Sequence, residues 1–92
     1  MAPINDKQII TIQLYRTRFC PRCAMASRHL RALTAGHPQL RVEEKEILSD
    51  WRGATEAGIG MIPAIRVDTR VLSGIYLSRT AIARFLKETG CL

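Results

Sequence analysis

The chain has 92 residues, of which 47% are hydrophobic, and this length accommodates one domain with a core of its own. It contains no apolar run long enough to span a membrane, and residues 1–7 lack the apolar segment of a secretory signal. We therefore expect a single domain over residues 1–92 with a flexible start at 1–7. We also expect a cytoplasmic protein that does not bind membranes. In the cytoplasm, cellular thiol systems keep most cysteines reduced.

The net charge is +6, and arginine contributes eleven of the fourteen positively charged side chains. The arginines are scattered from Arg16 to Arg84, and aromatic residues make up only 5% of the chain. Since a base-stacking platform combines aromatic side chains with a basic surface, we do not expect specific nucleic-acid binding. The scattered arginines are expected to form a solvated surface. A milder functional interpretation is that their field attracts acidic partner proteins.

The first predicted element is a β-strand over residues 8–15. Its apolar residues Ile10, Ile12 and Leu14 alternate with polar neighbours. Ile9 breaks strict alternation, which favours a central strand covered on both faces.

The next feature is the motif Cys20-Pro21-Arg22-Cys23, which joins this strand to a predicted helix. Pro21 suits a first helical turn, because its fixed φ is helical and its missing N–H needs no partner there. The free N–H groups and the positive dipole end of the helix favour a thiolate at Cys20. Arg18 and Arg22 add positive charge nearby. Such surroundings predict a reactive, more exposed Cys20 and a Cys23 at the edge of the core.

That helix is predicted over residues 21–35, and Gly36 is expected to end it. Its buried stripe follows helical spacing and consists of Cys23, Ala26, Leu30 and Leu33.

The rest of the chain predicts a strand over 40–47, a short helix over 51–57, strands over 64–67 and 70–76, and a last helix over 79–88. The polar middle of 40–47 is typical of an edge strand. The turn of Asp68 and Thr69 is too short for anything but an antiparallel pair, whereas the first two strands, joined through a helix, should be parallel. The order β-α-β-α-β-β-α predicts an α/β fold with a four-stranded mixed sheet flanked by helices.

Several single residues carry further expectations. Gly74 should form a bulge or a close backbone approach within its strand. Ser49 or Asp50 should cap the short helix and Ser78 the last helix, and Trp51 is expected to pack. Cys91, the penultimate residue, is expected to be a frayed-end thiol with no fixed role, and a contact across a dimer is the weaker alternative. The chain is expected to be a monomer.

The pattern resembles the thioredoxin-fold superfamily, and within it the small glutaredoxin-like and thioredoxin-like proteins. The motif at residues 20–23 follows the first strand and has the glutaredoxin form, with Pro after the first Cys. Tyr15 stands five residues before the motif, as an aromatic residue often does in glutaredoxins. Ile62–Pro63 precedes the predicted hairpin where the family carries a cis-proline that faces the active site. The resemblance covers about residues 8–87 and implies a thioredoxin-like fold, a redox-active cysteine pair and a cis bond before Pro63.

The chain also departs from the family patterns. Thr17 stands where glutaredoxins usually carry Lys, and Arg22 stands where they usually carry Tyr. Gly74 stands alone in place of a Gly-Gly pair, and the acidic pair that follows is missing. These departures leave glutathione binding an open question. The thioredoxin form is not matched either, because Phe19 replaces its Trp.

The function expected from these residues is dithiol–disulfide exchange. The Cys20 thiolate attacks a disulfide of a protein or a small molecule, and Cys23 resolves the mixed disulfide. The residues expected to support this site are Pro21, Arg22, Arg18, Ile62 and Pro63. No cofactor beyond the redox disulfide is expected, and a thioredoxin reductase-like enzyme or glutathione would recharge it.

Two alternatives stay open. Cys20 and Cys23 could bind zinc or an iron–sulfur cluster, with a dimer supplying four thiolates; a single chain offers no second cysteine pair, so no metal ligand is assigned. The cysteines could also be structural in a non-enzymatic module. A disulfide over such a short loop would stabilise the protein little.

Overall fold

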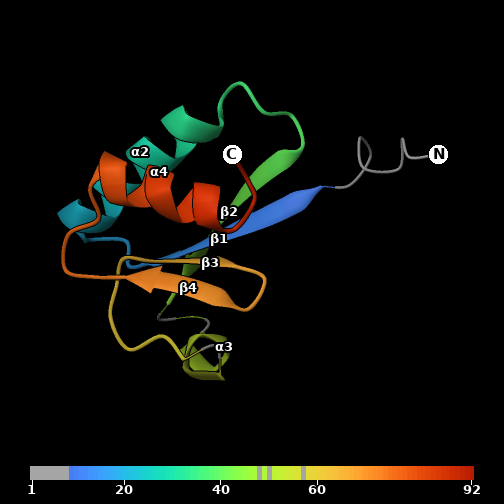
Figure 1. The fold of residues 1–92 in the computed structure, drawn as a ribbon. Helices are drawn as coiled ribbons and strands as arrows, with labels where there is room; N and C mark the ends of the chain where they lie inside the picture. Colours follow the sequence, from blue (N-terminus) through green and yellow to red (C-terminus); the bar gives the residue numbers. More distant parts are fainter. Residues whose placement is uncertain (1–8, 48, 50, 57) are drawn as a thin grey trace.

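The computed structural model describes residues 9–47, 49, 51–56 and 58–92. Seven elements follow one another in the predicted order (Figure 1): β1 (Ile10–Arg16), α2 (Pro21–Thr34), β2 (Leu40–Glu46), α3 (Trp51–Glu56), β3 (Ala64–Val67), β4 (Arg70–Ser73) and α4 (Arg79–Glu88). The expected start at residues 1–7 and the alternative cap Asp50 lie outside the described residues. Within the described part of the chain, no helix has the length and apolar character needed to cross a membrane.

The four strands form one mixed sheet in the order β2-β1-β3-β4, which confirms the predicted fold class. β1 pairs in parallel with β2, so that Arg16 lies opposite Glu46. β3 runs antiparallel to β1, with Tyr15 opposite Ala64, and β4 returns antiparallel to β3 through the turn at Asp68. Asp68 adopts a positive φ of 56° in that turn. β2 is the edge strand that its polar middle predicts, and β1 is central.

Both faces of β1 are covered. Helices α2 and α4 lie side by side over one face of the sheet, and α3 lies on the other side (Figure 1). Ile12 and Leu14 point into the main core beneath α2 and α4. Tyr15, one residue further, packs on the opposite face with Ile59 and Ala64. This period-two division follows from the alternating directions of side chains along a strand.

β3 and α4 have the predicted bounds, and the ends that differ elsewhere do so by one to three residues. α2 ends at Thr34, ahead of the predicted stop at Gly36, and the Thr34 hydroxyl donates to the Leu30 carbonyl at 3.0 Å. β4 ends at Ser73, so Gly74 follows the strand and forms no bulge within it. The Gly74 N–H instead donates to the Pro63 carbonyl at 3.3 Å, which ties the start of the β4–α4 connection to the start of β3.

Two single-residue expectations are wrong. Trp51 is 62% exposed and does not pack into the protein, because it stands at the first position of a helix of only six residues. Cys91 is only 5% exposed and belongs to the main core. Beyond α4, Gly90 takes a φ of 83° and turns the chain back, so that the Cys91 N–H donates to the Leu86 carbonyl at 2.8 Å. The C-terminal end is therefore held by backbone hydrogen bonds and is not frayed.

Candidate active site

Cys20 is the N-cap residue of α2. Its backbone is extended, with φ −113° and ψ 105°, and Pro21 occupies the first helical turn as predicted. The Cys20 sulfur accepts a hydrogen bond from the Cys23 backbone N–H at 3.1 Å. Cap residues are usually Ser, Thr, Asp or Asn, whose oxygen accepts from the same kind of helix N–H. Here a sulfur takes that place, so the unpaired N–H groups of the helix are directed at the thiol.

The pKa of the Cys20 thiol is lowered from its ordinary value. Burial acts the other way and raises the pKa, since only 8% of the residue is exposed. Hydrogen bonds from the side chain and backbone of Cys23, the positive charge of Arg22 and a hydrogen bond from the Arg22 backbone together outweigh it. Cys20 is less exposed than the sequence predicts, yet it is stabilised as a thiolate.

Cys23 has the opposite character, and it is fully buried one turn further along α2. Burial, the hydrogen bond to Cys20 and the negative charge of Cys20 raise the pKa of Cys23 to about 11. A hydrogen bond from the Thr17 backbone and the charge of Arg16 act in the lowering direction. The two thiols are hydrogen-bonded to each other, with a lowered pKa at Cys20 and a raised pKa at Cys23, and no disulfide joins them.

The other predicted site residues lie at the same end of the sheet. Tyr15 pairs with Ala64, so the segment after β1 that leads to Cys20 and the segment before β3 that contains Pro63 leave the sheet together. The Ile62–Pro63 peptide bond is cis, as the resemblance predicts. Pro63 is buried and Ile62 is half-buried.

The charged residues around the thiols divide into two groups. Arg22 is exposed on the first turn of α2 and acts on Cys20. Arg18 is also exposed, and it lines a shallow pocket of about 240 Å³ together with Arg16, Glu44 and Glu46. The structure therefore brings Pro21, Arg22 and Cys23 to the Cys20 sulfur, whereas Arg18 faces the neighbouring pocket.

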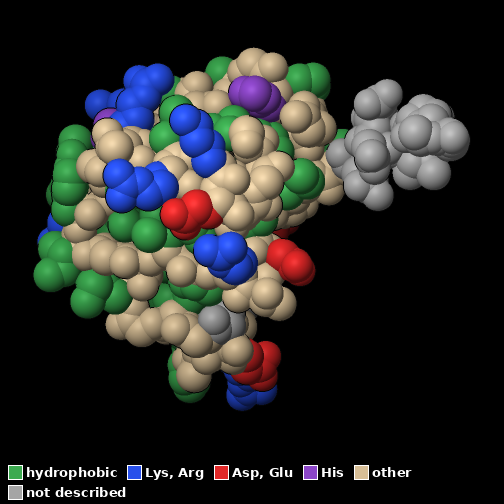
Figure 2. Space-filling model, in the orientation of Figure 1, with side chains coloured by type: hydrophobic (Ala, Val, Ile, Leu, Met, Phe, Trp, Pro, Cys, Tyr) green, Lys and Arg blue, Asp and Glu red, His purple; other side chains and the backbone are tan. Residues whose placement is uncertain are grey.

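An exposed group of large apolar side chains surrounds this end of the molecule. We call Phe19, Met61, Ile75 and Tyr76 the apolar rim; all four are exposed, and Phe19 is 91% exposed. Phe19 precedes Cys20, Met61 lies two residues before Pro63, and the other two follow Gly74, which is bonded to Pro63. Figure 2 shows hydrophobic side chains gathered over the start of α2 and the connection into α4. Of these four residues, the sequence singles out only Phe19, as the residue in place of the thioredoxin Trp. The rim is not evident from the sequence, because its members come from three separate segments.

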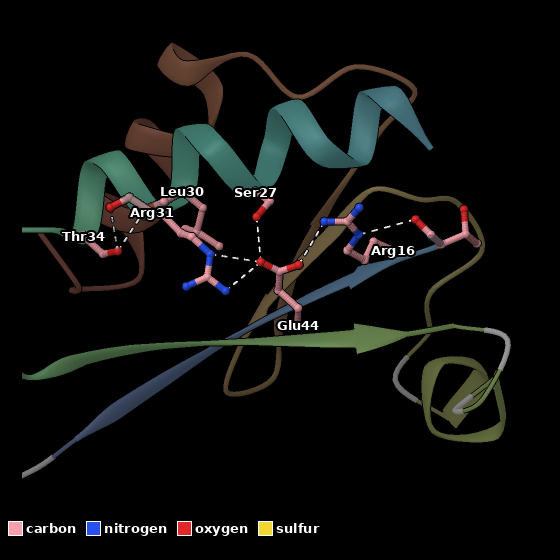
Figure 3. A network of polar contacts seen from close by, with 7 residues as sticks. Arg16, Ser27, Leu30, Arg31, Thr34 and Glu44 are labelled. Carbon is pink, nitrogen blue, oxygen red and sulfur yellow. Dashed lines mark hydrogen bonds and ion pairs between the residues drawn. The ribbon is translucent and has the colours of Figure 1, made fainter. Parts of the chain in front are cut away.

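A second feature missed from the sequence is the polar network centred on Glu44 of β2 (Figure 3). Its carboxylate contacts Arg16 of β1 and Ser27 and Arg31 of α2. Burial raises the pKa of Glu44, but the hydrogen bonds from these three side chains outweigh it and lower the pKa. A signal was present in the sequence, because Glu44 follows apolar Val42 by two residues and therefore lies on the strand face that packs against α2.

No protein-family model matches the chain, and no curated protein sequence matches it. The structure does resemble solved structures. Mitochondrial thioredoxin 3 from Saccharomyces cerevisiae, in its oxidized form, superposes with a TM-score of 0.67 at 18% identity, covering 94% of this chain and 84% of that one. A mutant thioredoxin from Halobacterium salinarum gives a TM-score of 0.71 at 14% identity, covering 98% and 82%. Thioredoxin O2 from Arabidopsis thaliana, also oxidized, gives 0.69 at 12% identity, covering 90% and 76%.

At these identities the likeness concerns the fold, a four-stranded mixed sheet flanked by helices. The protein has a thioredoxin fold.

Proposed function

We propose that the protein is a thiol–disulfide oxidoreductase that acts on protein disulfides through Cys20 and Cys23. The observation that supports this function best is the division of roles between the two thiols. Cys20 has a lowered pKa at a helix N-terminus, and Cys23 lies buried behind it with a raised pKa and donates to it. A nucleophilic thiolate beside a protected second thiol is the arrangement that disulfide exchange requires.

The proposed reaction has two exchange steps. The Cys20 thiolate attacks one sulfur of the partner disulfide, forms a Cys20–partner bond and releases the other partner sulfur as a thiolate, which takes a proton from solvent. Cys23 then loses its proton to solvent and attacks the Cys20 sulfur. The Cys20–Cys23 bond forms, the Cys20–partner bond breaks, and the partner leaves fully reduced. Two electrons pass from the dithiol to the partner, and a reductase, either thioredoxin reductase-like or glutathione-dependent, restores the dithiol.

The surroundings of Cys20 favour a polypeptide as substrate. The apolar rim offers exposed side chains that a protein segment would cover. Arg18, Arg22 and Arg79 are exposed at the same end, and none of them forms an ion pair with a carboxylate of the described residues. A disulfide flanked by apolar and acidic residues therefore suits this surface best.

The metal-binding alternative gains no support from the structure. In residues 9–47, 49, 51–56 and 58–92, no group of three or more His, Cys, Asp or Glu side chains is arranged to hold a metal ion.

The test is reduction of the disulfides of insulin by the protein in the presence of dithiothreitol. We expect Cys20→Ser to abolish the acceleration over dithiothreitol alone. Cys23→Ser, reduced beforehand and then mixed with insulin without dithiothreitol, should accumulate a mixed disulfide on a non-reducing gel, because no second thiol resolves it. Cys91→Ala is the matched control, because it removes the third thiol away from the site, and it should keep wild-type activity. Equal rates for wild type and Cys20→Ser would contradict the proposal.

A further inference from the structure

The Glu44 network joins three elements, which are β1, β2 and α2. One oxygen of Glu44 accepts from Arg16 Nη1 at 2.9 Å. The other accepts from the Ser27 hydroxyl at 2.6 Å and from Arg31 Nη2 at 2.6 Å. Figure 3 shows Glu44 between β1 and α2, with both carboxylate oxygens engaged. Since Cys23, Ser27 and Arg31 follow at intervals of four residues, the network continues the face of α2 that carries Cys23.

Arg16 connects this network to the buried thiol. Its Nη1 is bound to Glu44, and its Nε donates to the carbonyl of Thr17 at 3.4 Å. The Thr17 backbone in turn interacts with the Cys23 sulfur. The Arg16 side chain is only 21% exposed, so its charge is partly shielded from solvent, and this charge acts on Cys23.

We propose that Arg16, held by Glu44, is the positioning residue that stabilises the Cys23 thiolate when Cys23 resolves the mixed disulfide. The inference rests on the proposed function and adds the group that assists its second step. A fully buried thiol next to apolar side chains resists ionisation. A guanidinium fixed nearby by a carboxylate and a carbonyl offsets part of that resistance without itself exchanging protons.

Among the described residues that surround Cys23, Arg16 is the one that supplies positive charge. From the start of α2, Cys20 faces it, and Cys20 carries no charge once it is bound in a mixed disulfide. From β2, Glu44 reaches towards it only through Arg16. The elements that share the core with α2 contribute apolar side chains, which are Ile65 and Val67 of β3 and Ile82, Phe85 and Leu86 of α4.

The test is stopped-flow reaction of the reduced protein with an aromatic disulfide that releases coloured thionitrobenzoate, in a Cys91→Ala background. Attack by Cys20 releases a first equivalent, and attack by Cys23 on the mixed disulfide releases a second. We expect Arg16→Met to shift the inflection of the pH profile of the second-phase rate upward by about one pH unit. The smaller thiolate fraction of Cys23 is partly offset by the greater nucleophilicity of a more basic thiolate, so the second phase at pH 7 should slow about threefold. The first phase should stay nearly unchanged.

Two controls separate charge from structure. Arg16→Lys retains the positive charge and should restore most of the rate of the second phase. Arg31→Met removes a different partner of the same carboxylate, on a side chain that is 56% exposed, and should leave the second phase at the wild-type rate.

Each remaining outcome counts against the inference. A second phase in Arg16→Met that matches wild type at every pH overturns it, and so does equal slowing in Arg16→Lys or Arg31→Met. If Arg16→Met does not fold, Arg16→Gln takes its place. Failure of both to fold would assign Arg16 to the stability of the fold and overturn its positioning role. Absence of a second phase in the wild type would instead overturn the proposed function itself.

Discussion

Cys20 and Cys91 are both nearly buried cysteines beside a helix end, yet the two ends of the molecule treat them differently. Cys20 caps the N-terminus of α2, where a helix N–H donates to its sulfur and Arg22 adds positive charge. Cys91 follows the C-terminus of α4, where helices present carbonyl oxygens, and its sulfur accepts only a 3.5 Å contact from the Thr89 hydroxyl within the described residues. Cys91 packs in the main core. Burial alone therefore does not determine the role of a thiol, whereas the helix end and the nearby charges do.

The largest expected difference between the two thiols is in alkylation. At neutral pH, iodoacetamide should modify Cys20 at least about tenfold faster than Cys91, because the thiolate is the nucleophile and Cys20 is the stabilised one. Mass spectrometry of peptides over a time course measures both rates in one sample. In urea the two rates should converge. Equal rates in the folded protein would remove the distinction between the two ends.

The next effect concerns Cys23 and high pH. The unfolded thiol ionises near its ordinary pKa of 9.0, whereas the folded one keeps its proton up to about 11. Between these values the folded state binds more protons than the unfolded state, so stability falls as pH rises, by up to about 2–3 kcal/mol. Urea unfolding of the reduced protein from pH 8 to 11 measures this loss. Reduced Cys23→Ser is the control, and curves that stay parallel would show that Cys23 is not the group responsible.

A smaller effect is expected at the other end of the chain. Cys91→Ser places a hydroxyl in the apolar core and should lower the free energy of unfolding by about 1–2 kcal/mol. Reduction of insulin disulfides should be unchanged, whereas Cys20→Ser should show the reverse pattern of retained stability and lost activity. A loss of activity in folded Cys91→Ser would show that Cys91 contributes to the reaction, and would contradict the distinction between the two thiols.

The smallest effect is expected for Arg22. Its charge stabilises the Cys20 thiolate, which belongs to the reduced form, so Arg22→Gln should raise the pKa of Cys20 and make the reduction potential more negative. An exposed charge contributes less than about 1 kcal/mol, which corresponds to about 10–20 mV. Redox titration in glutathione buffers measures the shift. Arg28→Gln, on the exposed part of the same helix, should not change the potential, and an unchanged potential in Arg22→Gln would refute the role of its charge.

The features that depend on neighbouring residues could be predicted from the sequence. The strand before the motif, Pro21 in the first turn, the cap at Ser78 and the short turn at Asp68 all follow local rules, and together they determine the order of the elements. The cap is confirmed by the Ala81 N–H, which donates to the Ser78 hydroxyl at 3.1 Å. The cis bond before Pro63 required the resemblance to a family, because no local rule determines it.

The features that depend on distant residues could not be predicted in this way. Cys91 is buried because Gly90 turns the chain back against Leu86. The position of Cys91 near the end of the chain favours the opposite expectation, an exposed thiol. Glu44 appeared to be one charge among several on an edge strand, and its partners on β1 and α2 become evident only when the crossover is folded. Trp51 lies on a helix of six residues and is 62% exposed, although large aromatic side chains favour burial.

The most direct test is the titration of the thiols by thiolate absorbance in the reduced Cys91→Ala variant, with Cys20→Ser in the same background as the reference. Two separate steps are expected. One, lost in Cys20→Ser, should lie below the ordinary free-thiol pKa of 9.0, and a later step should lie near the value of about 11 given for Cys23. A Cys20 step at or above the free-thiol value would contradict the assignment of Cys20 as the nucleophile, and the proposed function with it.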